Sequence, residues 1–314
     1  MKKKISIVVA CYQDALSIPE MHNRITETMK EVPLDYEIIF VNDGSTDNTE
    51  DILDKICKDD KKVTAIFHSR NFGLQNAFTS GMNQFSGDAV VLLDGDMQDP
   101  PELIPKLISK WIEGYEVVYG ERVSRDSPVI MNFAYKAFYR IFNKISYLKI
   151  PLDAGDFSLM DKKVVVSINS LKEKDRFIRG LRAWVGFKQI GVPYKRDRRK
   201  YGKSNFSLLG NFKWAKKGIF SFTFFPLEFV SYVAYFLFIV SIFGIIFNII
   251  YYFIEPAPRG IYAIIVLVLF LGSTNLLFLS ILSEYISKIL EETKKRPSFL
   301  IKKIINNNKT EKLF

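Results

Sequence analysis

Three carboxylates crowd one short stretch of the chain, LDGDMQDPPE, in which Asp94, Asp96 and Asp99 lie within six positions of one another. Like charges this close repel, so the cluster needs a counter-charge. An Asp-x-Asp pattern can bind a hard divalent cation, and Mg²⁺ usually takes one or two carboxylates together with phosphate oxygens of a substrate. The alternative is an acidic turn at the end of a strand, because Asp, Gly and Pro are common turn residues.

The elements that must position this cluster favour the ligand site. We expect strands at 5–12, 36–43, 63–69 and 89–96 and helices at 18–31, 48–59 and 71–85. This alternation predicts an α/β domain with a mostly parallel sheet, in which ligands bind beyond the carboxyl ends of the strands. Polar clusters follow three of those ends, at 12–14, 42–45 and 94–99, and a chance acidic turn would not recur along one edge. No G-x-G-x-x-G follows the first strand, so a Rossmann dinucleotide site is not expected.

Two long apolar stretches, at 226–254 and 261–283, follow this domain. About 20 apolar residues cross a bilayer core as a helix, so both stretches are long enough to be transmembrane helices. The short connector between them makes the pair a hairpin. Lys and Arg are frequent at 195–217 and after the second stretch, whereas the connector holds a single basic residue. The positive-inside rule then places the N-terminal domain and both termini in the cytoplasm, on the inner (cytoplasmic) membrane.

Two further segments flank the apolar stretches. Residues 206–225 mix Phe and Trp with three Lys, which is typical of an interfacial amphipathic segment that leads the chain into the membrane. Residues 284–314 are predicted to form a cytoplasmic tail with a frayed polar end. Asn248 and Asn275 within the spans would permit helix–helix association, and hence a homo-oligomer.

The composition argues against several other classes of site. The only cysteines and histidines are Cys11, Cys57, His22 and His68, and none has metal-ligand spacing, so a zinc site or a Ser-His-Asp triad has little to build on. Basic and aromatic residues could bind nucleic acid, but here they border the apolar stretches, where they set topology and attract anionic lipid. We therefore expect a membrane partner and no nucleic acid. A two-span transporter is disfavoured because neither span carries an ionisable residue at its middle.

Several long blocks resemble the signatures of family 2 glycosyltransferases with the GT-A fold, namely IIFVNDGSTDNT, SRNFGLQNAFTSGM, LDGDMQDPPELI and DAGDFSLMDKKVV. The block RFIRGLRAWVGFKQIGVPYKRDRRKYGKSNFSL, followed by two apolar stretches, is similar to the polyprenyl-phosphate glycosyltransferases, which include bactoprenol glucosyltransferases and dolichyl-phosphate mannose synthase. The resemblance implies a GT-A nucleotide-sugar-binding domain at 1–205 that uses Mg²⁺ or Mn²⁺. The implied reaction is inverting transfer of a hexose, with glucose favoured, from a UDP-sugar to polyprenyl (undecaprenyl) phosphate for cell-envelope glycan modification.

The resemblance also implies which residues would bind the nucleotide sugar. Tyr12 and Asp14 match the first-strand motif that contacts the nucleotide, and Asp43 matches a carboxylate that reads the base. Arg199 and Ser204 match an Arg-x-x-Gly-x-Ser loop beside the phosphates. Arg199 would then stabilise the charge that grows on the leaving diphosphate.

The metal and acceptor positions follow in the same way. Asp94 and Asp96 match the Asp-x-Asp that holds the metal and the diphosphate, and Gln98 is a further metal-site residue. Arg122, in YGERVSR, matches a position associated with the acceptor phosphate, and Asp156, in DAGDF, lies in the acceptor-side block. Asp96, Asp156 and Arg199 are thus the implied catalytic residues.

Two rival functions stay open. The first is a family 2 transferase with a glycan or protein hydroxyl as acceptor, which would need a dedicated general base. Asp156 could be that base, or it could position the sugar, because a lipid phosphate oxygen is already anionic and needs less such help. The second rival is a non-catalytic nucleotide-binding membrane scaffold, which the intact Asp94-Gly95-Asp96 disfavours.

Overall fold

The computed structural model describes residues 3–123, 151, 154–197, 200–201, 223, 225–254 and 260–306. These residues fall into two units. An α/β unit contains the described residues up to 201 and again from 296, and a helical unit contains those between 223 and 295. The α/β class expected for the N-terminal domain is confirmed.

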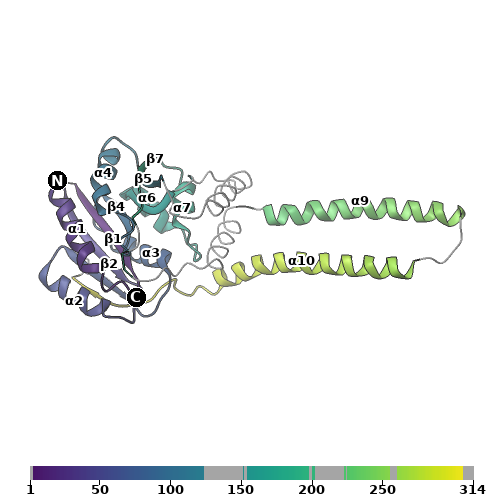
Figure 1. Ribbon diagram of the computed structural model, residues 1–314, viewed down its shortest axis with the longest axis horizontal. Helices are drawn as coiled ribbons and strands as arrows, with labels where there is room; N and C mark the ends of the chain where they lie inside the picture. Colours follow the sequence, from purple (N-terminus) through teal and green to yellow (C-terminus); the bar gives the residue numbers. More distant parts are fainter. Residues whose placement is uncertain are drawn as a thin grey trace. The chain divides into compact units, whose positions relative to one another are not determined.

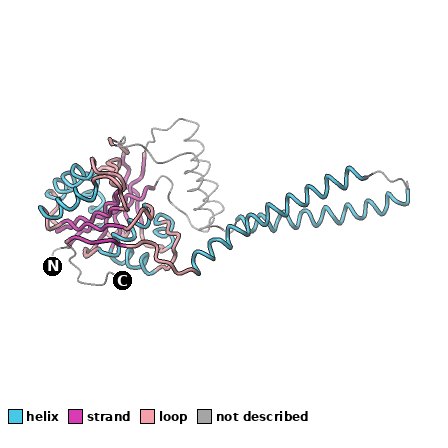
Figure 2. Tube along the Cα trace, turned by 90° about the horizontal axis from the view of Figure 1, so that it is seen from below, coloured by secondary structure: helices cyan, strands magenta, loops and turns pink. Residues whose placement is uncertain are grey.

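One sheet runs through the α/β unit (Figures 1 and 2). Its strands are β1 (Lys4–Cys11), β2 (Asp35–Asn42), β3 (Val63–His68), β4 (Ala89–Asp94), β5 (Val117–Arg122), β6 (Ala154–Asp161), β7 (Gln189–Tyr194) and β8 (Ile301–Ile305). Their order is β7-β5-β6-β4-β1-β2-β3-β8. Strands β1 to β4 pair in parallel, β5 and β7 pair in parallel, and β6 and β8 run antiparallel to their neighbours. The mostly parallel sheet expected from the sequence is therefore observed.

Helices cover both faces of this sheet, which is why its central strands are continuous apolar runs rather than alternating ones. The helices are α1 (Ile18–Lys30), α2 (Thr49–Asp59), α3 (Leu74–Gln84), α4 (Ile104–Ile112), α6 (Lys162–Ser170) and α7 (Ile178–Trp184). On one face, Ile5, Ile7 and Val9 of β1 join a core with α1, α2 and α4. On the other, α3 lies so close to β1 that a Cβ at Gly81 would meet Val8 Cγ1 at 2.3 Å.

The helical unit consists of two long helices, α9 (Phe225–Ile254) and α10 (Ile261–Thr293), which run side by side in opposite directions (Figures 1 and 2). Both are long and apolar enough to cross a membrane, over Phe225–Gly244 and Leu267–Thr293. Large apolar side chains such as Phe243 and Leu269 are exposed along them. The 33 residues of α10 make it about 50 Å long, which exceeds the roughly 30 Å of a bilayer core.

The described residues after 283, which the sequence predicts to be a cytoplasmic tail, contain regular secondary structure up to residue 305, and their cytoplasmic location stays a prediction. Helix α10 continues to Thr293, and β8 then pairs with β3, with Ala65 opposite Ile305. Lys303 forms ion pairs with Glu50 and Asp54 of α2. Two adjacent lysines interrupt the apolar residues of IKKII, so neither strict alternation nor a continuous apolar run marked it as a strand. The interfacial segment predicted at 206–225 lies, apart from residues 223 and 225, outside the described residues.

Candidate active site

Strand register brings the polar clusters together at one edge of the sheet. Ala10 of β1 lies opposite Val41 of β2 and opposite Asp94 of β4, so the three strands end level with one another. The Gly95 N–H donates to the Ala10 carbonyl at 2.8 Å, and the Ser17 hydroxyl donates to the Gly95 carbonyl at 2.8 Å. The turn that carries the Asp-x-Asp pattern is thereby fixed to the end of β1.

The loop after β4 concentrates negative charge, and we call Asp94, Asp96 and Asp99 the acidic loop. Asp96 and Asp99 are buried, with exposed fractions of 7% and 2%. Burial raises the pKa of Asp94 well above its usual range, and the charges of Asp96 and Asp99 raise it further. Gly95 has no room for a side chain, because a Cβ there would lie 2.9 Å from the Ala10 carbonyl and 3.3 Å from Asp14 Oδ2.

The acidic loop fits a divalent metal completed by substrate. Carboxylate and amide oxygens are the ligands that Mg²⁺ and Mn²⁺ prefer. The Gln98 side-chain NH₂ donates to the Asp197 carbonyl at 3.2 Å, which leaves the amide oxygen as its acceptor end. Within the part of the chain that the structure describes, no three His, Cys, Asp or Glu side chains are arranged as a metal site of their own. Asp94, Asp96 and Gln98 therefore suit a metal that also takes oxygens from a diphosphate.

Asp99 does more than shape the turn, the only role that its sequence context indicates. Its carboxylate accepts hydrogen bonds from the Tyr194 hydroxyl at 2.5 Å and from Arg196 Nε at 3.2 Å. Arg122 Nη2 lies 3.9 Å from its other oxygen, and Arg122 Nε donates to the Tyr194 hydroxyl at 3.3 Å. Asp99 thus ties the acidic loop to the ends of β5 and β7.

A second charged region surrounds Asp156 on β6, and we call its three basic members, Arg122, Arg179 and Arg182, the arginine cluster. Arg179 of α7 binds both carboxylate oxygens of Asp156, at 3.0 and 2.9 Å. Burial alone would raise the pKa of Asp156, but Arg179, together with Arg182 and Arg122, outweighs burial and the pKa falls below its usual value. Arg122 lies against Gly155, where a Cβ would meet its Nη2 at 3.1 Å.

Arg182 is the most deeply buried member of the arginine cluster, with an exposed fraction of 1%. Its Nη2 donates to the Gly155 carbonyl at 3.2 Å, and its Nη1 has no hydrogen-bond partner among the described residues. Burial lowers its pKa to about 10, so it stays protonated at neutral pH. The cluster sets three guanidinium groups near Asp156, one of which, Arg122, also faces Asp99, and the excess of positive charge suits an anion.

Tyr12 and Asp14 lie in the turn that follows β1. Asp14 Oδ2 accepts the Tyr12 N–H at 3.0 Å, and the intervening Gln13 has a φ of 57°. The Gln13 N–H donates to Ser45 Oγ at 2.9 Å, which joins this turn to the loop after β2. The structure therefore brings together the first two polar clusters, as the sequence predicts.

The carboxylate of Asp43 is buried and bound by other groups of the protein. Its carboxylate accepts N–H groups from Phe72 at 2.9 Å and Gly73 at 2.7 Å, and His68 Nδ1 lies 2.8 Å from it. These contacts hold the loop before α3, so the helix starts at Leu74 rather than at the predicted residue 71. His68 is buried, with an exposed fraction of 3%. A contact between Asp43 and a nucleotide base stays a prediction.

The remaining expected site residues, Arg199 and Ser204, lie outside the described residues. Sequence reasoning missed Arg179, Arg182 and Arg196, although two arginines three positions apart in RFIRGLRAW were a readable signal, since such residues lie on one face of a helix.

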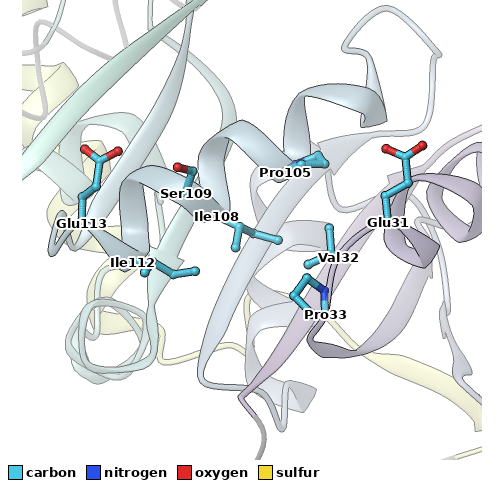
Figure 3. Close-up of a pocket in the computed structure, with 8 residues that line it drawn as sticks. All are labelled: Glu31, Val32, Pro33, Pro105, Ile108, Ser109, Ile112 and Glu113. Atoms are coloured by element: carbon cyan, nitrogen blue, oxygen red, sulfur yellow. The ribbon is translucent and has the colours of Figure 1, made fainter.

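A pocket of about 330 Å³ lies elsewhere in the α/β unit (Figure 3). It is lined by Glu31, Val32, Pro33, Pro105, Ile108, Ser109, Ile112 and Glu113. These residues follow α1, belong to α4 or, in the case of Glu113, cap its end, so the pocket borders the amino ends of the parallel strands. Its lining shares no residue with the acidic loop or the arginine cluster, and it is not part of the candidate site.

Comparison with known proteins gives the family. The model of glycosyl transferase family 2 matches residues 6–168. A glycosyltransferase of Bacillus subtilis, YkcC, is 42% identical over 95% of this chain and 93% of its own length. The SfII prophage-derived bactoprenol glucosyl transferase of Shigella flexneri is 37% identical over 97% and 99%, respectively. The prophage bactoprenol glucosyl transferase homolog of Escherichia coli is 36% identical over 96% and 99%.

Likeness to solved structures is looser. A glucosyl-3-phosphoglycerate synthase from Mycobacterium tuberculosis, solved with Mn²⁺, UDP-glucose and phosphoglyceric acid, has a TM-score of 0.48 and 18% identity, covering 69% of this chain and 77% of that one. The family match and the near full-length relatives are the stronger findings. On those grounds the chain belongs to the family 2 glycosyltransferases, with an α/β catalytic domain of the GT-A kind.

Proposed function

We propose that the chain transfers a hexose, with glucose favoured, from a UDP-sugar to a polyprenyl phosphate such as undecaprenyl phosphate. A single displacement at the anomeric carbon would invert its configuration and release the nucleoside diphosphate. The observation that carries the proposal is the near full-length similarity, at 36–38% identity, to relatives named as bactoprenol glucosyl transferases or a homolog. The resulting polyprenyl-phosphate sugar would serve as a donor for the modification of cell-envelope glycans.

The donor diphosphate would bind at the acidic loop. Asp94 and Asp96, with Gln98, would hold Mg²⁺ or Mn²⁺, which when bound supplies positive charge to the leaving diphosphate. The crowding of carboxylates supports this assignment, because burial and then the charges of Asp96 and Asp99 raise the pKa of Asp94, and a bound cation would offset both effects.

The nucleotide would lie over the turns after β1 and β2. Tyr12 and Asp14 would contact it, and the hydrogen bond between the Gln13 N–H and Ser45 Oγ holds the two turns in one surface. Arg199 and Ser204, which follow β7 in the sequence, would contact the diphosphate. Arg199 there would stabilise the developing charge of the leaving group.

The acceptor phosphate would bind at the arginine cluster. Guanidinium groups bind phosphate oxygens through paired, charge-assisted hydrogen bonds. Arg122 is the member assigned to this contact, since it lies between Asp99 and Gly155 and so borders both charged regions. Arg182, with a buried Nη1 that lacks a partner in the described structure, adds positive potential behind it.

Asp156 would position the arginine cluster rather than take a proton. Both of its oxygens are bound by Arg179, and its lowered pKa makes it a weak general base. A hydroxyl acceptor would need such a base, whereas a phosphate oxygen is already anionic. This observation favours the lipid phosphate over the glycan or protein hydroxyl as acceptor.

The two long helices would anchor the enzyme in the inner (cytoplasmic) membrane, with the catalytic domain and both termini in the cytoplasm. Support comes from the apolar spans of α9 and α10 and from the basic residues that flank them. Association of the spans into a homo-oligomer stays a prediction.

Lipid labelling tests the proposal. The full-length protein in detergent is incubated with undecaprenyl phosphate, Mg²⁺ or Mn²⁺, and a panel of radiolabelled UDP- and GDP-sugars, and the label extracted with the lipid is counted. We expect UDP-glucose to label the lipid most strongly, and EDTA to abolish labelling. An Asp96→Asn protein serves as the inactive control. If no donor labels the lipid with either metal, the proposal fails.

A further inference from the structure

One guanidinium is shared by two carboxylates of the acidic loop. Arg196 Nη2 lies 3.7 Å from Asp96 Oδ2, and its Nε lies 3.2 Å from Asp99 Oδ1. The Arg196 side chain is 27% exposed, whereas both carboxylates are almost fully buried. Neither the family resemblance nor the relatives assign Arg196 a role in the reaction.

Arg196 is the described guanidinium that faces both Asp96 and Asp99 of the acidic loop, whereas Arg122 lies 3.9 Å from Asp99. Buried like charges are tolerated only when a counter-charge is near. Arg196 therefore places positive charge at carboxylates that a divalent cation would also contact.

The backbone beside Arg196 is fastened to the same loop. The Asp197 N–H donates to the Gln98 carbonyl at 2.9 Å, and the Gln98 side-chain NH₂ donates to the Asp197 carbonyl at 3.2 Å. Because these two bonds fix the main chain, the guanidinium can leave the carboxylates by side-chain rotation alone. Partly exposed ion pairs contribute little free energy, so a divalent cation can replace this one.

We propose that Arg196 is a built-in counter-cation of the acidic loop, which neutralises Asp96 and Asp99 while the site is free of metal and is displaced from them when the metal binds. The inference rests on the proposed metal-dependent function. The displaced guanidinium remains beside the place where the donor diphosphate would bind, three residues before Arg199. One side chain would thus serve the empty site as a counter-ion and the loaded site as an anion ligand.

Binding of Mn²⁺ without nucleotide tests this proposal. The full-length protein in detergent is freed of metal with EDTA, and the disappearance of the free Mn²⁺ paramagnetic resonance signal is titrated. We expect Arg196→Gln to lower the Kd for Mn²⁺ about three- to tenfold, because the metal no longer competes with an ion pair. Arg196→Lys, which keeps the charge, should bind nearly as the wild type does. Lys110→Gln removes the same charge from an exposed pair on α4 and should change nothing.

A second measurement uses the unaltered protein, so it does not depend on how a variant folds. Phenylglyoxal modifies accessible arginines, and mass spectrometry of the peptides reports the rate at each. Mg²⁺ should raise the rate at Arg196 and leave unchanged the rate at Arg24, which is paired with Glu102.

The outcomes separate this inference from the function on which it rests. Equal Mn²⁺ affinity in wild type and Arg196→Gln, or no change in Arg196 modification when Mg²⁺ saturates the site, would overturn the counter-cation role and leave the metal site standing. Absence of saturable Mn²⁺ binding in both proteins would overturn the metal site itself, and the inference with it. Saturable Mn²⁺ binding by Arg196→Gln but not by the wild type would support the inference strongly.

Discussion

The acidic loop and the arginine cluster are both charged, buried and close to the same strand ends. The acidic loop has an excess of negative charge, whereas the arginine cluster has an excess of positive charge. In the acidic loop, Arg196 faces Asp96 and Asp99, and burial together with the neighbouring carboxylates raises the pKa of Asp94. In the arginine cluster, Arg179 binds Asp156, and the positive charges of Arg179, Arg182 and Arg122 lower the pKa of that carboxyl. A site for a metal–diphosphate complex and a site for an anionic acceptor would differ in this way. Arg122, 3.9 Å from Asp99, lies between the two.

The largest effect should come from removing a metal ligand from the acidic loop. Asp96→Asn should lower the rate of sugar transfer on the order of 10³-fold, because stabilisation of the leaving diphosphate is lost. The melting temperature without metal should not fall, since one of several repelling charges is removed. Transfer and thermal unfolding are measured on the same preparation. If the variant keeps more than a tenth of the wild-type rate, the acidic loop does not take part in the reaction.

Breaking the ion pair of the arginine cluster should cost stability instead. Arg179→Gln leaves Asp156 buried without its bidentate partner, and we expect the free energy of unfolding to fall by about 2–3 kcal/mol. The Asp156→Asn/Arg179→Gln double variant should recover part of this loss, because the two residues act as a pair. Chemical denaturation of all three variants measures the coupling. Strict additivity would show that the pair contributes no joint stability.

Stability should depend on pH in opposite directions at the two regions. The lowered pKa of Asp156 contributes stability above its usual range near 4, and this is lost as the pH falls through the lower folded-state value. The raised pKa of Asp94 destabilises the metal-free protein at neutral pH, and this penalty shrinks as the pH falls toward 4. In EDTA, Asp94→Asn should therefore stabilise the protein more at pH 7.5 than at pH 5. An equal gain at both values would contradict the repulsion inferred for the acidic loop.

The smallest effect should come from an arginine outside both regions. Arg24 binds both oxygens of Glu102, at 2.7 and 2.6 Å, which matches the geometry of Arg179 with Asp156. Its pair is far more exposed, so Arg24→Gln should lower the free energy of unfolding by less than about 1 kcal/mol. A loss equal to that of Arg179→Gln would mean that burial does not distinguish the arginine cluster from the surface.

Strands β1 to β4 and the edge at which they end could be predicted from the sequence, because each is a short apolar run closed by turn residues. Strand β8 could not, since it is an edge strand whose pairing with β3 depends on a return of the chain after the two long helices. The tail predicted for residues 284–314 therefore included no strand. Long-range pairing leaves little local signal.

The acidic loop could also be predicted from the spacing of its carboxylates, but the residues that contact it could not. Asp99 is contacted by Arg122 at the end of β5, by Tyr194 at the end of β7 and by Arg196 just after β7. Burial and hydrogen bonding decide what each of these residues does, and neither is visible in residue types. Asp156 shows the same limit, because only its contact with Arg179 separates a positioning residue from a general base.

The choice of acceptor tests the central claim most directly. The wild-type protein is given UDP-glucose, Mg²⁺ and, in parallel reactions, undecaprenyl phosphate or undecaprenol, and labelled lipid is counted. We predict transfer to the phosphate and none to the alcohol, because the arginine cluster would bind an anion and both oxygens of Asp156 are bound by Arg179. Transfer to undecaprenol, with undecaprenyl phosphate left unlabelled, would contradict this account of the site.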